Sequence, residues 1–246
     1  MYAPHLADRY AVRLRGGARV RTTLDAAIQK RVEHIIRRGL LRFNGTITNA
    51  AAILADTASG EILARVGSPG YFSPTAGQFD ACAASRSPGS ALKPFIYALA
   101  IEKSLLYPSE MLLDAPVDYG NYRPENFEQG FSGLIPAWAA LRTSLNIPAL
   151  TVINRLSQQE LHDFLRKSGL SSLKMATEHY GLGLVLGGCE VKLEELAGAY
   201  AILANLGERI PLHTEFDPPV SRSRLLQPGT CLAAYEMLEQ TLPDTT

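Results

Sequence analysis

Apolar positions spaced three to four residues apart predict that much of this chain is helical. The first such segment follows Thr22 and Asp25, which suit a helix start, and it ends between residues 39 and 44. Its apolar face consists of Leu24, Ile28, Val32, Ile35, Ile36 and Leu40. Residues 1–21 have little periodicity and many Arg and Gly residues. We therefore expect a linker or lead-in segment there, followed by one domain over residues 22–246.

Residues 50–66 have a different pattern, in which two short apolar runs flank a turn. Residues 50–56 are apolar at almost every position, residues 57–60 (TASG) contain a turn glycine, and residues 61–66 form the second run. This arrangement predicts a β-hairpin. A strand that is apolar throughout is typical of one covered on both faces.

Further helices are predicted in the remainder of the chain. Residues 91–101 should form a buried helix, because the first helical turn does not need the N–H that Pro94 lacks. Ser157 and Glu160 have the spacing of a capping box. The other helices are expected at residues 136–145, 148–156, 157–169, 190–206 and 230–242. Residues 107–135 contain Pro, Gly, Asn and aromatic residues without periodicity, so we expect a functional loop.

Composition and charge restrict the class of protein. The chain has 246 residues, 46% hydrophobic and 20% charged, which is enough apolar material for an ordinary core. Lys plus Arg and Asp plus Glu number 24 each, so charge gives no reason to expect a nucleic-acid or anionic-membrane partner. No apolar run reaches the roughly 18 residues of a membrane span, and no signal-type stretch occurs at the N-terminus.

The cysteines and histidines do not have the spacing of a metal site. Cys82, Cys189 and Cys231 are far apart in the sequence, and no Cys-x-x-Cys motif occurs. No two histidines are three or four residues apart. We expect the three cysteines to be small buried hydrophobic residues.

Ser90 and Lys93 form a Ser-x-x-Lys motif at the start of the predicted buried helix. Positions i and i+3 of a helix lie on one face, so the lysine amine can reach the serine hydroxyl. Burial lowers the pKa of a lysine, and the neutral amine can then accept the hydroxyl proton. Ser171 and Lys174 have the same spacing, but they follow a helix end where Lys174 is expected to be solvated.

Ser144 and Asn146 form a Ser-x-Asn motif at the predicted break between two helices. Two polar side chains can project from such a turn into a cleft. The same residue types also commonly cap or terminate helices. These residues alone leave both interpretations open.

Together with their surroundings, these motifs resemble class A penicillin-binding proteins, and the 1C branch of that family in particular. The active-serine signature of the family is similar to residues 86–95 (RSPGSALKPF). Further segments agree in the same order: residues 22–25 (TTLD) with Gln29, 56–64 (DTASGEILA), 122–127 (YRPENF), 140–148 (ALRTSLNIP), and 181–207, from GLG to ANLG. The resemblance covers about residues 19–241.

The resemblance implies an α+β fold of the penicillin-binding protein and serine β-lactamase type, with an antiparallel sheet flanked by helices. It also implies acyl transfer, in which Ser90 attacks the penultimate D-Ala carbonyl of a peptidoglycan stem peptide and Lys93 accepts its proton. Ser144 would relay a proton, and Asn146 would bind the substrate amide and Lys93. Asn126, Ser144 and Asn146 are the implied substrate-binding residues.

The same resemblance implies the partners and the location. β-Lactams, which mimic the D-Ala-D-Ala end, would stall at the Ser90 ester, and the N–H of Ser90 would form half of an oxyanion hole. No cofactor or metal is implied. Members of the family act at the periplasmic face of the inner membrane, and no oligomeric state is implied.

The third motif of the family, a Lys-Thr-Gly on a strand after the glycine-rich turn, is absent from that position. Lys167, Ser168 and Gly169 are similar, but they precede the turn and suit the C-terminal end of a helix. The sequence ends about where that strand begins in the family. We therefore expect an incomplete sheet at the C-terminus and an exposed apolar edge on the strand at residues 50–56.

We expect this chain to be a partial penicillin-binding transpeptidase domain, with doubtful activity as a fragment. The alternative is a non-catalytic remnant, or a module that binds β-lactams or a partner without turnover. An unrelated α/β binding domain would need all the ordered matches to be fortuitous.

Overall fold

Helices predominate in the computed structural model, which describes residues 3–14, 19–118, 124–127, 130–216 and 221–239. The α-helices are α1 (Pro4–Arg13), α2 (Ala26–Leu40), α3 (Lys93–Glu102), α4 (Ala137–Arg142), α5 (Asn146–Arg155), α6 (Gln158–Lys167), α7 (Thr177–Tyr180), α8 (Leu193–Ala204) and α9 (Pro228–Glu239). The strands are β1 (Ala52–Ala55), β2 (Ile62–Val66), β3 (Met111–Asp114), β4 (Gly133–Pro136), β5 (Glu208–Arg209) and β6 (Ser223–Arg224). Three 3₁₀ helices are η1 (Leu41–Phe43), η2 (Gly89–Leu92) and η3 (Gly181–Leu186).

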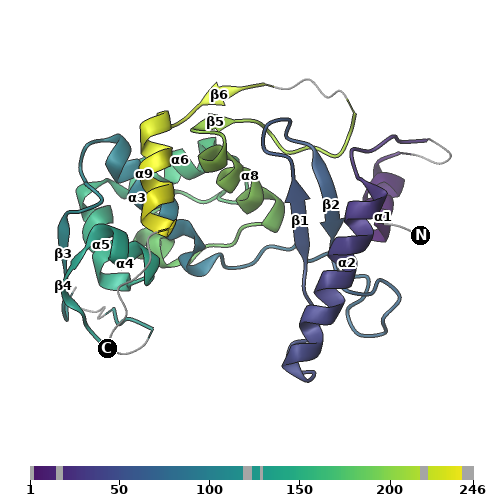
Figure 1. The fold of residues 1–246 in the computed structure, drawn as a ribbon, viewed down its shortest axis with the longest axis horizontal. Coiled ribbons are helices and arrows are strands. Elements are labelled where there is room, and N and C mark those ends of the chain that lie inside the picture. Colours follow the sequence, from purple (N-terminus) through teal and green to yellow (C-terminus); the bar gives the residue numbers. More distant parts are fainter. Residues whose placement is uncertain (1–2, 15–18, 119–123, 128–129, 217–220, 240–246) are drawn as a thin grey trace.

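The described elements form two groups. Helices α3, α4, α5, α6 and α9 lie together, and the β1–β2 hairpin with α2 lies on the other side of α8 (Figure 1). The strands pair as three antiparallel two-stranded sheets, β1–β2, β3–β4 and β5–β6. These helices and antiparallel pairs confirm the predicted α+β class.

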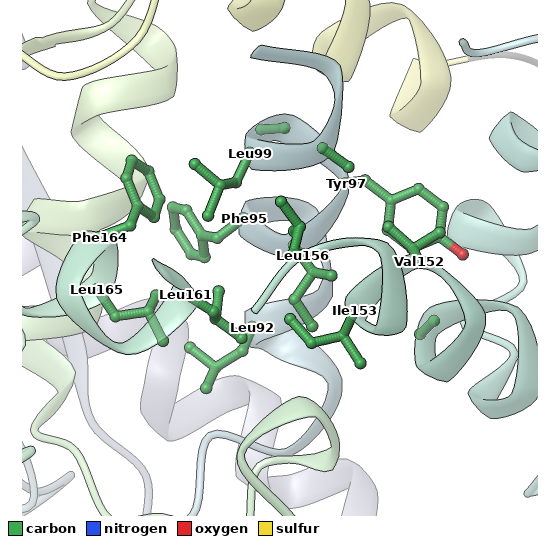
Figure 2. Close-up of a cluster of buried hydrophobic side chains, with 14 of the residues drawn as sticks. Leu92, Phe95, Tyr97, Leu99, Val152, Ile153, Leu156, Leu161, Phe164 and Leu165 are labelled. Carbon is green, nitrogen blue, oxygen red and sulfur yellow. The ribbon is translucent and has the colours of Figure 1, made fainter. Parts of the chain in front are cut away.

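Helix α3 is the centre of the hydrophobic core. Every residue from Lys93 to Ala100 is buried, as the apolar run predicts, and Pro94 lies in the first turn, where it needs no hydrogen-bond acceptor. Its side chains pack against α5 and α6 (Figure 2). The residues drawn there include Leu92, Phe95, Leu99, Ile153, Leu156, Leu161 and Leu165. The tight packing of α3 fixes the position of any side chain in its first turn.

The predicted hairpin is confirmed, with β1 and β2 paired antiparallel through a turn. The prediction that both faces of the first strand are covered was wrong, because Leu54 is 44% exposed. Among the described residues β1 pairs with β2 alone, so its other edge is unpaired. An apolar groove of about 580 Å³ is lined by side chains of β1, α8 and α9.

The prediction of a loop over residues 107–135 missed the β3–β4 hairpin. In β3, Leu112 and Asp114 are buried while Met111 and Leu113 are exposed. Burial alternates along this strand, but its exposed residues are apolar and one of its buried residues is acidic. The sequence therefore does not show the apolar–polar alternation that is typical of a half-buried strand. Residues 119–123 of this segment lie outside the described residues.

The segment at residues 1–21, expected to be a linker or lead-in, contains helix α1. His5 and Leu6 are buried, and His5 Nε2 lies 2.9 Å from the carbonyl oxygen of Gly77. Arg9 forms an ion pair of 2.8 Å with Glu194 at the start of α8. The lead-in segment is thus attached to the loop that follows the hairpin and to α8. No helix in the described part of the chain is long and apolar enough to cross a membrane.

Candidate active site

Ser90 lies in the 3₁₀ turn η2, which leads directly into α3. Its side chain is exposed, and its carbonyl oxygen accepts a hydrogen bond from the N–H of Lys93. Residues i and i+3 of a 3₁₀ turn are nearly eclipsed, so Ser90 and Lys93 share one face of this turn. The N–H of Ser90 donates to none of the described residues, which leaves it available to an oxyanion.

Lys93 is buried at the start of α3, and among the described residues its ammonium has three hydrogen-bond acceptors, none of them the Ser90 hydroxyl. Its side chain nitrogen lies 2.5 Å from the Ser144 carbonyl oxygen, 2.7 Å from Asn146 Oδ1 and 3.3 Å from Ser144 Oγ. Burial lowers the pKa of Lys93 to about 8. A neutral amine retains two donors for the carbonyl and the amide oxygen, and its lone pair is then free to accept a hydroxyl proton.

The turn between α4 and α5 presents Ser144 and Asn146. Ser144 has a φ of +59°, in the left-handed region that non-glycine residues seldom adopt, and its carbonyl oxygen is held by Lys93. Asn146 is the first residue of α5, and its Nδ2 donates to the Glu125 carbonyl oxygen at 2.7 Å. The Asn146 amide oxygen therefore faces Lys93. The predicted break between two helices is confirmed, but it lies at residues 143–145, and residues 146–148, where it was expected, form the first turn of α5.

Ser90, Ser144 and Asn146 line the same cavity, which has a volume of about 740 Å³. Phe127 and Phe131 also line it, and Phe127 is almost fully exposed. The Ser90 hydroxyl, a second hydroxyl and an amide thus face one space, with a buried amine hydrogen bonded to two of the residues. This arrangement is suited to acyl transfer by a serine.

Asn126, which we expected to bind substrate, is buried and makes its hydrogen bonds within the protein. Its Nδ2 lies 2.9 and 3.0 Å from the two oxygens of Asp114 and 2.9 Å from the Gly130 carbonyl oxygen. Its Oδ1 accepts from the N–H of Asn146 at 2.8 Å. One acceptor lone pair on Oδ1 is all that remains for a substrate. Residues 122 and 123 of the same motif lie outside the described residues.

Asp114 is a further residue of this site, and no sequence pattern predicted it. Its signal in the sequence is weak, since it is one acidic residue that follows an apolar run and precedes a single proline, Pro116, by two positions. Only the fold brings it to Asn126, twelve residues further along the chain.

The other motifs with family-like spacing lie in structural positions. Lys167 ends α6, the Ser168 hydroxyl donates to the Phe164 carbonyl oxygen at 2.8 Å, and Gly169 has a φ of +107°. These are features of a helix C-terminus. Ser171 donates to Glu195 at 2.6 Å, and Lys174 is exposed, as expected.

The three cysteines are free and buried, which confirms the prediction that they act as small hydrophobic residues. Burial raises the pKa of the Cys82 thiol to about 12 and of Cys189 and Cys231 to about 11, so all three remain protonated at neutral pH. Within the described part of the chain, no group of three or more His, Cys, Asp or Glu side chains is placed to hold a metal ion.

Comparison with known protein families gives a match to the penicillin-binding protein transpeptidase domain over residues 50–245. The chain belongs to this family. The penicillin-binding protein 1C of Escherichia coli is 33% identical over 98% of this chain, in line with the expected likeness to the 1C branch. The penicillin-binding protein 1F of Bacillus subtilis is 29% identical over 81% of the chain. The chain spans 32% and 28%, respectively, of the length of these two relatives.

Solved structures confirm the fold of a penicillin-binding transpeptidase domain. The PonA1 protein of Mycobacterium tuberculosis in complex with penicillin V has a TM-score of 0.78 at 20% identity, covering 96% of this chain and 70% of that one. The transpeptidase domain of penicillin-binding protein 3 of Burkholderia pseudomallei has a TM-score of 0.74, covering 89% of this chain and 69% of that one.

Proposed function

We propose that this penicillin-binding transpeptidase domain is of the serine type, with Ser90 as the nucleophile that attacks a D-Ala-D-Ala stem peptide of peptidoglycan. The observation that carries the proposal is the meeting of Ser90, Ser144 and Asn146 in one cavity, with the buried Lys93 hydrogen bonded to Ser144 and Asn146. The lowered pKa of Lys93 supports its role as the base.

The first half-reaction forms an ester and releases an amino acid. Ser90 Oγ bonds to the carbonyl carbon of the penultimate D-Ala, and Lys93 takes the hydroxyl proton. The Ser90 N–H stabilises the oxyanion, and the C–N bond to the terminal D-Ala breaks. That amine leaves with a proton relayed through Ser144, which lies 3.3 Å from Lys93. Asn146 binds the substrate amide.

The second half-reaction forms the cross-link. The amine of a neighbouring stem peptide attacks the ester carbonyl, so a C–N bond forms and the C–O bond to Ser90 breaks. The proton lost by the amine returns to the Ser90 oxygen through Lys93. No cofactor takes part in either step. A β-lactam would follow the first half-reaction and remain as the Ser90 ester, and the site of action would be the periplasmic face of the inner membrane.

In this proposal Asn126 holds Asn146 in place by accepting a hydrogen bond from its N–H. At most one lone pair of the Asn126 amide oxygen is left for substrate. The alternative function, binding of β-lactams or a partner without turnover, differs in its products. A binding module that lacks turnover would release no D-Ala from a stem peptide.

Labelling with a fluorescent penicillin tests the proposal. The chain is expected to retain the label after denaturation, and Ser90→Ala is expected to abolish it. Ser171→Ala is the matched control, because it removes the serine of the other Ser-x-x-Lys pair and should label like the wild type. A chain that melts cooperatively and does not label, or a Ser90→Ala variant that still labels, would contradict the proposal.

A further inference from the structure

Asp114 is a carboxylate with no exposed surface, at the end of β3. A buried carboxylate is costly unless hydrogen bonds or a cation compensate its charge. Asp114 accepts from Asn126 Nδ2 through both oxygens and from the N–H of Ser132 at 2.7 Å. Among the residues that the structure describes, these hydrogen bonds, and no ion pair, contact the Asp114 carboxylate.

The carboxylate determines which way the Asn126 amide points. An ionised carboxylate can only accept hydrogen bonds, so the NH₂ group of Asn126 must face Asp114. The amide oxygen then faces the opposite direction, where it accepts from the N–H of Asn146 at 2.8 Å. With the amide reversed, two N–H donors would face each other at Asn146. Asp114 thus fixes the contact that holds the first residue of α5.

The same contact fixes the acceptor of Lys93. Asn146 Oδ1 lies 2.7 Å from Lys93 Nζ, and its orientation depends on where α5 begins. A continuous line of hydrogen bonds therefore runs from Asp114 through Asn126 and Asn146 to Lys93. Small displacements of a catalytic group can cost up to about a hundredfold in rate.

We propose that Asp114 is a positioning residue of the Ser90 centre, which acts through Asn126 and Asn146 to hold the acceptor of Lys93. The proposal rests on the proposed roles of Ser90 and Lys93. Tyr97 is a second buried titratable group beside Asp114. Burial raises the pKa of Tyr97, and the negative charge of Asp114 raises it further. Tyr97 therefore stays neutral, and it neither compensates nor replaces the carboxylate.

The test measures the acylation rate constant with a fluorescent penicillin for Asp114→Asn, for Asn126→Ala and for the double variant. Each single variant is expected to acylate roughly 10- to 100-fold more slowly than the wild type. Because Asp114 acts through Asn126, the double variant should be no slower than the slower single variant. Losses that multiply in the double variant would overturn the proposal.

The pH dependence of acylation separates positioning from a general loss of stability. A hydrogen bond from the Lys93 ammonium to Asn146 Oδ1 favours the charged form, so its loss lowers the pKa of Lys93. The inflection of the rate against pH is therefore expected to move to lower pH in Asp114→Asn. A melting temperature that falls while the inflection stays in place would overturn the proposal.

Glu110→Gln is the matched control. It removes a carboxylate from the residue just before β3, but Glu110 pairs with Arg155 at 2.6 Å and not with Asn126. The acylation rate of Glu110→Gln, and the pH at which that rate inflects, should equal those of the wild type. If Asp114→Asn does not fold, Asp114→Glu takes its place, because it keeps the charge and displaces the carboxylate by one methylene group. A slower folded Asp114→Glu supports the proposal, and a wild-type rate overturns it.

Failure of this proposal is distinct from failure of the proposed function. If the folded wild type is not acylated, the role of Ser90 is wrong. If the wild type is acylated and Asp114→Asn matches it in rate and in pH profile, only the role of Asp114 is wrong.

Discussion

At the scale of single residues, Lys93 combines burial with three acceptors for its three ammonium protons. Burial favours the neutral amine and lowers its pKa to about 8. Near neutral pH the charged form still predominates, and it satisfies all three acceptors. The neutral form gives up one donor, and its lone pair can then accept a proton at the longest contact, to Ser144 Oγ. The residue is thus suited to exchange a proton with the Ser144 hydroxyl.

We predict that the acylation rate rises with pH and levels off above about 8, since the neutral amine is the active form. Lys93→Ala should lower the rate by about 10²- to 10⁴-fold, the usual contribution of a general base. Penicillin acylation measured between pH 6 and 10 tests both statements.

Lys167→Ala is the control for that series, because Lys167 belongs to the Lys-Ser-Gly sequence that resembles the third family motif. It lies at the end of α6, and its variant should acylate as the wild type does. A rate that does not depend on pH, or a Lys167→Ala variant as slow as Lys93→Ala, would refute the assignment of the base.

The site residues that could be predicted from sequence are those whose partners are close along the chain. Ser90 and Lys93 are one turn apart, and Ser144 and Asn146 share a turn, so spacing alone brings each pair together. The contact between Lys93 and Asn146 joins residues 53 positions apart, and the family resemblance was needed to expect it. Asp114 belongs to no local pattern, and its role depends on the tertiary fold.

At the scale of elements, the helices with clear caps and apolar periodicity were predicted well. Asp25 caps α2 by accepting from the N–H groups of Ala27 and Ile28, and Ser157 and Glu160 form the predicted capping box of α6. The short strands β3 and β5 were missed because their residues lack an alternating pattern. Helix α1 was missed because Ala3 provides no side-chain cap.

The capping box of α6 makes the stability of the fold depend on pH. Hydrogen bonds from Lys103 and from the N–H of Ser157 lower the pKa of Glu160 to about 2. Because the pKa in the fold lies below the unfolded value of about 4.3, this contribution is complete above that value. It is lost as the pH falls towards 2.

We predict that Glu160→Gln lowers the free energy of unfolding by about 1 kcal/mol or less at pH 7, since the group is exposed to solvent. The difference from the wild type should shrink between pH 4.5 and pH 2. Urea unfolding at several pH values measures it. Glu236→Gln, on the exposed face of α9, is the control and should change little at any pH. A Glu160→Gln deficit that is constant from pH 7 to pH 2 would refute this account.

At the scale of the whole molecule, the turn that carries Ser90 is held by a segment almost a hundred residues away. The Ser87 hydroxyl donates to the Gly187 carbonyl oxygen at 2.7 Å. A Cβ on Gly187 would lie 2.3 Å from the Cα and N of Gly89, and Gly187 has a φ of +78°. Only glycine permits this approach. The glycine-rich turn after α7 thus positions the turn that carries Ser90, which gives a physical reason for the glycines in that part of the family resemblance.

We predict that Gly187→Ala lowers stability by roughly 1–3 kcal/mol or more, through a strained φ and a clash with the serine turn. It should also slow acylation at Ser90. Thermal melts and penicillin labelling measure the two effects. Gly45→Ala is the matched control, because Gly45 has a φ of +83° with no atom within 4 Å of an added Cβ. The account is wrong if both variants lose the same stability and neither changes acylation.

The most direct test of the account is mass spectrometry of the chain after reaction with a penicillin. We expect one intact penicillin adduct per chain, as an ester on Ser90 in the tryptic peptide that begins after Arg86. An adduct at any other residue, or no adduct on a chain that melts cooperatively, would contradict the claim that the Ser90 hydroxyl is the nucleophile.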